Sequence, residues 1–151
     1  MYLTGIADEA SQDIEEQINV TKELGWNAIE SRFVNGKNLH DLDEESFDRV
    51  CEAIDRSGVH INALGSAIGN WGKDVRDDFS ITEGEIERAI PRMKRLGAKF
   101  IRIMSYKVLE QDDQMVEERI RRLRLIVEAF VSEGLVPVHE NCMNYGGMSW
   151  R

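Results

Sequence analysis

The feature that most constrains the fold is a unit that recurs four times: an amphipathic helix pattern, a glycine, and a short run rich in β-branched residues. The glycines are Gly25, Gly58, Gly97 and Gly134, about 35 residues apart. The short runs span residues 26–30, 59–64, 99–104 and 135–140, and another run at 1–7 precedes the first helix. Strand and helix therefore alternate up to a fifth strand, which predicts a parallel sheet.

The four predicted helices each carry apolar residues three or four positions apart. We expect them to start near Asp13, Asp43, Thr82 and Gln114, with Asp13–Glu16 and Thr82–Glu85 acting as capping boxes. Each helix pattern stops at one of the glycines, a residue suited to the left-handed position after a helix. The expected inward-facing residues are Ile14, Ile18, Thr21 and Leu24; Phe47, Val50, Cys51 and Ile54; Ile86, Ile90, Met93 and Leu96; Val116, Ile120, Leu123, Val127, Phe130 and Val131.

The length of 151 residues fits a single domain over 1–151, and the 42% hydrophobic content is enough for a sizeable core. Four β/α units and a fifth strand can form an open doubly wound sheet or part of a (β/α)₈ barrel. No Gly-x-Gly-x-x-Gly follows the first strand, which disfavours the dinucleotide-binding fold. We therefore expect an α/β protein that is a partial (β/α)₈ TIM barrel.

Charge and hydropathy disfavour several classes of partner. The formal net charge of −9 and the isoelectric point near 4.9 disfavour nucleic acid, because phosphates would be repelled. No apolar run approaches the roughly 18 residues of a membrane span, and the start of the chain lacks the pattern of a signal peptide. The two cysteines do not suggest a disulfide framework, so we expect a cytoplasmic protein with no membrane partner.

Polar side chains accumulate where each predicted strand ends, and in a parallel barrel these ends converge on one mouth. Carboxylates and a histidine there could bind a divalent metal or perform acid–base chemistry on a small polar substrate. Adjacent strand residues point to opposite faces, so only one of His139 and Glu140 can point inward, and Val136 and Val138 favour Glu140. The polar residues are Asp8, Glu9, Glu30, Arg32, Asn62, Ser66, Ser105, Tyr106, Lys107, His139, Glu140 and Asn141.

Structural roles compete with these functional ones. A carboxylate at a strand end is often a helix cap or a solvated loop group. His60, between Val59 and Ile61, is expected to be packed or hydrogen-bonded, and His40 to be solvent-exposed in a polar loop. The cluster Arg119, Arg121, Arg122 and Arg124 is expected to form a solvated helix face paired with Glu117, Glu118 and Glu128.

Three short motifs, in this order after successive strands, give the chain a family resemblance. They are Gly5–Glu9, Ala28–Arg32 with Asn35–Asn38, and Val138–Asn141. Together they resemble the N-terminal portion of the sugar phosphate isomerase/epimerase group of xylose-isomerase-like TIM barrels.

The resemblance implies a divalent metal (manganese, magnesium, cobalt or zinc) at the barrel mouth, with Glu140 as a ligand and catalytic residue. It also implies that Glu9, Glu30, Arg32 and Lys37 lie near a sugar or sugar phosphate, and Asn141 is a further substrate-binding candidate. The implied reaction is isomerisation or epimerisation through an enediolate, in which a carboxylate moves a proton. The metal would polarise the carbonyl.

The other metal ligands of such families come from later strands, which this sequence does not contain. We therefore expect either the N-terminal portion of a longer enzyme or a partial barrel that forms homo-oligomers through its exposed sheet edges. The alternative function is a non-catalytic truncated barrel that binds a small polar ligand or a partner subunit. An enzyme of the endonuclease IV type is disfavoured by the three histidines and the net charge of −9.

Overall fold

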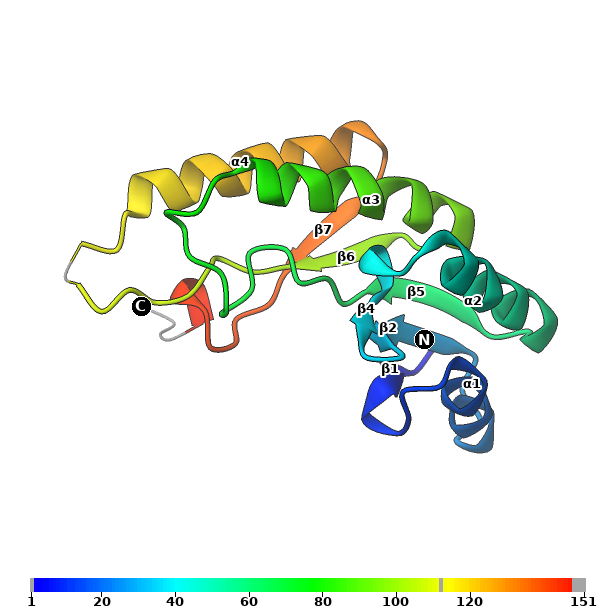
Figure 1. Ribbon diagram of the computed structural model, residues 1–151. Helices are drawn as coiled ribbons and strands as arrows, with labels where there is room; N and C mark the ends of the chain where they lie inside the picture. The colour runs from blue at the N-terminus through cyan, green and yellow to red at the C-terminus, as the bar shows by residue number, and fades with distance from the viewer. Residues whose placement is uncertain (1, 112, 148–151) are drawn as a thin grey trace.

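The computed structural model describes residues 2–111 and 113–147, so Met1, Asp112 and residues 148–151 of the predicted domain lie outside it. Five parallel strands form one sheet in the order β1-β2-β5-β6-β7, which confirms the predicted α/β class and partial-barrel topology (Figure 1). The strands are β1 (Thr4–Ile6), β2 (Ala28–Ser31), β5 (His60–Leu64), β6 (Phe100–Ile103) and β7 (Val136–His139).

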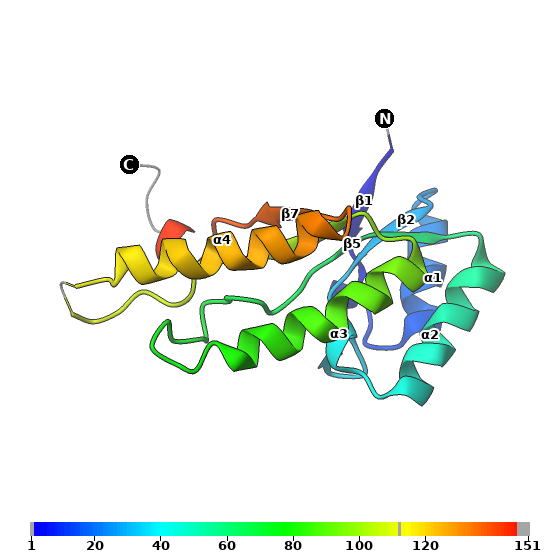
Figure 2. The ribbon, with the colours of Figure 1, turned by 90° about the horizontal axis from the view of Figure 1, so that it is seen from above.

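Four helices cover one face of this sheet, and the opposite face carries no helix layer in the described residues (Figures 1 and 2). They are α1 (Ile14–Glu23), α2 (Glu44–Ser57), α3 (Ser80–Leu96) and α4 (Val116–Ser132). Ile29, Ile61 and Ile101 on the covered face are at most 1% exposed, whereas Val136 and Val138 on the open face are exposed. The core therefore lies between the sheet and the helices, as in the wall of a barrel.

Local sequence signals explain most helix ends. The Asp13 side chain accepts hydrogen bonds from the backbone N–H groups of Glu15 and Glu16, and Asp43 caps α2 through Ser46. These contacts satisfy N–H groups that have no partner inside the helix. Gly58 and Gly97 follow α2 and α3 with positive φ, as the glycine pattern predicts.

The start of α3 differs from the prediction. The helix begins at Ser80 after Phe79, so Thr82 and Glu85 lie within it and do not form a capping box. Both side chains are buried, because this part of α3 packs against the short 3₁₀ helix η2 (Leu39–Asp41).

The buried faces of α1 and α4 also differ in part from the prediction. Leu24 is 57% exposed, and Gln17 is buried because its amide donates to the backbone oxygens of Ser11 and Phe33. In α4, Phe130 is buried as predicted, but Arg119 and Arg122 are buried too. Their burial turns part of the predicted apolar stripe outward: Val116, Ile120, Val127 and Val131 are exposed.

Three further short elements complete the fold. An antiparallel hairpin of β3 (Phe33–Val34) and β4 (Lys37–Asn38) follows β2 and leads into η2. The 3₁₀ helices η1 (Ala7–Glu9) and η3 (Tyr145–Gly147) follow β1 and β7. Among the described residues, no helix is both long and apolar enough to cross a membrane.

Candidate functional site

A cavity of about 370 Å³ lies at the carboxyl ends of the strands, on the face of the sheet without helices. Parallel strands bring their carboxyl ends to the same edge, so residues far apart in sequence meet there. Every strand of the sheet contributes, directly or through the residues that follow it. The lining residues are Ile6, Glu30, Ala63, Arg102, Val138, His139, Glu140 and Asn141.

An ion pair lies within this cavity. Glu140 follows β7, and its Oε2 lies 2.9 Å from Nη1 of Arg102 on β6. Arg102 is also fixed from behind, because its Nη2 donates to the backbone oxygens of Gly65 and Ser66. Glu140 Oε2 is buried and makes no hydrogen bond to the described residues, although its charge faces Arg102. The pair places a negative and a positive group side by side at the strand ends.

Four of the predicted strand-end residues reach the cavity: Glu30, His139, Glu140 and Asn141. His139 and Glu140 both line it, although the alternation along the strand led us to expect only Glu140 there. Glu9 and Arg32 do not line it but bind each other, with Arg32 Nη2 2.6 Å from Glu9 Oε1, and Arg32 Nε also donates to Asp8. Their ion pairs join η1 to the end of β2.

Lys37 also lies apart from the cavity. It is exposed on β4, with Nζ 3.9 Å from Oδ2 of Asp43. No sequence pattern predicts the hairpin of β3 and β4. This hairpin places Lys37 near the start of α2.

Arg102 is the cavity residue that sequence reasoning missed. Its signal is a charged residue inside the otherwise apolar run Phe100–Ile103. A charged side chain on a strand of the sheet needs hydrogen-bonding or charged partners. The partners of Arg102 are two backbone carbonyl groups and one carboxylate.

The cavity does not by itself fit a divalent metal. Metal sites in proteins usually take three or more side-chain ligands. Glu30, His139 and Glu140 line the cavity, but among residues 2–111 and 113–147 their ligand atoms do not gather within 4.8 Å of one another.

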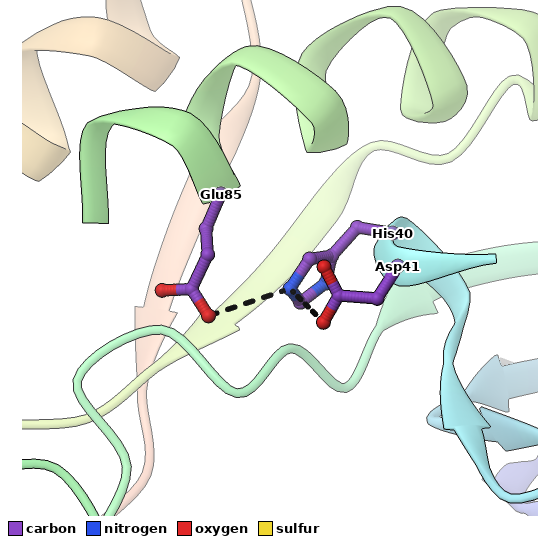
Figure 3. A group of neighbouring side chains, drawn as sticks. All are labelled: His40, Asp41 and Glu85. Carbon is purple, nitrogen blue, oxygen red and sulfur yellow. Dashed lines mark ion pairs between the residues drawn. The ribbon is translucent and has the colours of Figure 1, made fainter. Parts of the chain in front are cut away.

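A second polar cluster, formed by His40, Asp41 and Glu85, lies between η2 and α3 (Figure 3). The prediction for His40 was wrong: it is 0% exposed, because Leu39 and Leu42 beside it are buried in the core. Burial raises the pKa of the Glu85 carboxyl, but His40 and Lys73 outweigh it and hold that pKa below its usual range. The prediction for His60 was also wrong, since its side chain is exposed, with its ring 6.1 Å from that of Tyr2.

Residues 18–150 match the family described as the xylose isomerase-like TIM barrel. The chain belongs to this family. The match confirms the resemblance that the three sequence motifs indicate. None of the curated proteins matches this sequence.

Solved structures of xylose isomerase-like barrels share the fold at low sequence identity. A xylose isomerase-like TIM barrel protein from Mycobacterium smegmatis, in complex with magnesium, has a TM-score of 0.70 and 12% identity over 91% of this chain and 54% of its own. A D-tagatose 3-epimerase-like protein has a TM-score of 0.67 and 17% sequence identity, and the match covers 96% of this chain and 54% of that protein. D-allulose 3-epimerase from Methylomonas sp., in complex with D-allulose, has a TM-score of 0.64 and 12% sequence identity, and the match covers 92% of this chain and 50% of that protein. This chain therefore spans about half the length of these relatives.

Proposed function

We propose that this chain forms part of the mouth of a metal-dependent isomerase or epimerase that acts on a sugar or sugar phosphate. The observation that carries the proposal is the Glu140–Arg102 pair in a cavity at the carboxyl ends of five parallel strands. In parallel barrels this is the end that holds active sites. Family membership and the sugar epimerases among the similar structures support the same substrate class.

The chemistry of the cavity suits an enediolate reaction. Such a reaction needs a base near the carbon that loses its proton and positive charge near the oxygen that becomes negative. In the proposal, Glu140 moves the proton and Arg102 stabilises the oxyanion. Glu30 and Asn141 offer hydrogen bonds to hydroxyl groups, and a cavity of about 370 Å³ can hold a small polar molecule.

The proposed metal is magnesium, manganese, cobalt or zinc, and magnesium is the ion in one similar structure. Among the described residues, no three ligand atoms gather around Glu140 in the cavity, so the site would need ligands beyond those residues. Turnover therefore depends on ligands that the described cavity lacks, whereas sugar binding depends on the residues present.

The test separates binding from turnover on the 151-residue protein. Saturation-transfer NMR would measure binding of D-allulose, D-tagatose, D-fructose and their phosphates, and ¹³C NMR would follow interconversion with Mg²⁺ or Mn²⁺ present. We expect binding of at least one sugar, weakened at least about tenfold (about 1.4 kcal/mol) in Glu140→Gln. Glu87→Gln, an exposed site on α3, is the matched control.

The outcomes distinguish the functions. Interconversion lost in Glu140→Gln supports the enzyme. Binding without interconversion supports the alternative of a non-catalytic, ligand-binding barrel. Absence of binding to every sugar, in a protein shown to be folded, would contradict both.

A further inference from the structure

The cluster of His40, Asp41 and Glu85 has the composition and spacing of a metal site. His40 and Asp41 come from η2, and Glu85 reaches them from α3 (Figure 3). His40 Nε2 lies 3.5 Å from Asp41 Oδ2 and 3.8 Å from Glu85 Oε1. One ligand atom from each residue fits within 4.8 Å of the other two. No residue of this cluster lines the cavity at the strand ends.

Three polar atoms of the cluster are buried without a hydrogen-bond partner among the described residues: both ring nitrogens of His40 and Oε2 of Glu85. His40 is 0% exposed, and neither of its ring nitrogens hydrogen-bonds to a described residue. Glu85 Oε2 is buried and equally unpartnered. Buried polar atoms are almost always satisfied in native proteins, by protein, water or a bound ion. Two buried side chains facing one another with unused ligand atoms therefore point to an occupant.

The backbone that carries His40 is held firmly. Arg92 of α3 is buried and donates to the backbone oxygens of Leu39 and Leu42, at 2.9 and 2.6 Å. Leu39 and Leu42 also anchor η2 in the core. Because η2 and α3 are fixed to one another, His40 and Glu85 face each other before any ligand arrives, which lowers the ordering cost of binding.

Nitrogen and carboxylate ligands select among cations. Ca²⁺ and Mg²⁺ prefer oxygen ligands alone, whereas one imidazole with two carboxylates suits Zn²⁺. Tetrahedral Zn²⁺ with ligands at about 2.0–2.2 Å sets its ligand atoms about 3.3–3.6 Å apart. The distances of 3.5 and 3.8 Å from His40 require only small side-chain movements. Asp41 is partly exposed, so the site has access to solvent for a water ligand.

Two cations of the protein already contact the cluster. Lys73, in the loop between β5 and α3, pairs with Oε1 of Glu85, and Arg88 Nη2 lies 2.7 Å from Oδ1 of Asp41. Asp41 Oδ2 remains directed at His40, so Arg88 does not obstruct the centre. Lys73 occupies the Glu85 oxygen that faces His40, and a metal ion would compete with it there.

We propose that His40, Asp41 and Glu85 form a Zn²⁺ site in which the metal displaces the Lys73 ammonium from Glu85. The ligands would be one imidazole nitrogen of His40 and one oxygen from each carboxylate, with water completing the tetrahedron. The released ammonium would turn into solvent at the end of its flexible side chain, while the backbone of Lys73 stays hydrogen-bonded to Asn70 and Lys107.

The experiment titrates metal-free protein with Zn²⁺ by calorimetry and follows the imidazole NMR signals of the three histidines. We expect one equivalent to bind and the His40 signals to change, while those of His60 and His139 do not. Glu85→Gln should weaken binding at least tenfold, and Lys73→Met should tighten it several-fold by removing the competing charge. Glu87→Gln, two residues further along the same helix, is the matched control and should bind as the wild type does.

Two outcomes would overturn the site: no binding at millimolar Zn²⁺, or binding that changes the signals of His60 or His139 and spares His40. A tighter complex in Lys73→Met cannot come from loss of folding. If Glu85→Gln fails to fold, the His40 signals of the wild-type protein and the Zn²⁺ affinity of Lys73→Met still show whether the cluster binds the metal.

Discussion

At the residue scale, Arg119 shows how one buried side chain can organise the strand ends. It is 1% exposed, and its guanidinium donates to the backbone oxygens of Gln114, Ser105 and Lys107. It also lies 4.7 Å from the centre of the Tyr145 ring. Arg119 therefore ties α4 to the segment after β6 and to η3, which follows the strand that leads to Glu140.

Replacing this arginine should destabilise the fold. Arg119→Met keeps the aliphatic length but leaves three carbonyl groups without their donor, at a cost of about 2–4 kcal/mol in the free energy of unfolding. Urea unfolding followed by circular dichroism measures it. Arg124→Ala, on the exposed part of the same helix, should change the value by less than about 0.5 kcal/mol. Equal effects of the two variants would contradict a special role for Arg119.

Sequence reasoning could not find Arg119 or the burial of His40, and the reason is physical. Periodicity distinguishes apolar from polar residues, but a long guanidinium can reach backbone carbonyls and lie inside the fold. Two of the oxygens that Arg119 contacts belong to Ser105 and Lys107, in the segment after β6. No local pattern in the sequence around Arg119 predicts these contacts. Glu140 is different, because the alternation of Val136, Val138 and Glu140 along a strand is a local signal.

At the element scale, the loop after β5 packs closely along the end of β6. Gly69 has φ +62°, and a Cβ there would lie 2.3 Å from the backbone oxygen of Met104. The backbone oxygens of Ile68 and Gly69 accept from the N–H groups of Met104 and Tyr106. Glycine is required here by conformation and by close approach together.

Two glycine substitutions separate these requirements. Gly36→Ala, at φ +74° with open space around the Cβ position, should cost about 1 kcal/mol from backbone conformation alone. Gly69→Ala adds a backbone clash and should cost about 1–3 kcal/mol more. Thermal unfolding of both variants measures the difference. If they prove equally stable, the close packing between loop and strand would be refuted.

Helices and strands could be predicted where the sequence has a long periodic pattern of apolar residues. The helices and the five sheet strands follow from repeated patterns and from glycines such as Gly58 and Gly97. The hairpin of β3 and β4 has two residues per strand, too short for any periodicity. Thr82 and Glu85 match the capping box pattern, but α3 starts earlier because tertiary contacts with η2 determine which residues are buried.

At the scale of the whole molecule, the sheet ends at β1 and β7, and apolar residues lie exposed beside the second edge. They belong to β7 and to the outer face of α4: Val136, Val138, Ile120, Val127 and Val131. An unpaired strand edge next to apolar surface favours association. The expectation of a homo-oligomer through the sheet edges remains a prediction, and this part of the surface is where it applies.

The prediction is that the 151-residue protein self-associates in a concentration-dependent way, with the edge formed by β7 and α4 at the interface. Ile120→Glu would place a charge in that interface and should weaken the dimer by at least about tenfold, or 1.4 kcal/mol. Leu24→Glu, directly after α1, is the control, because Leu24 is also apolar and 57% exposed but lies away from β7 and α4. Size-exclusion chromatography with light scattering over a range of concentrations measures the masses. A wild-type protein that stays monomeric throughout, or a Leu24→Glu variant that dissociates as readily as Ile120→Glu, would refute this interface, since the argument depends on apolar exposure beside one particular strand edge.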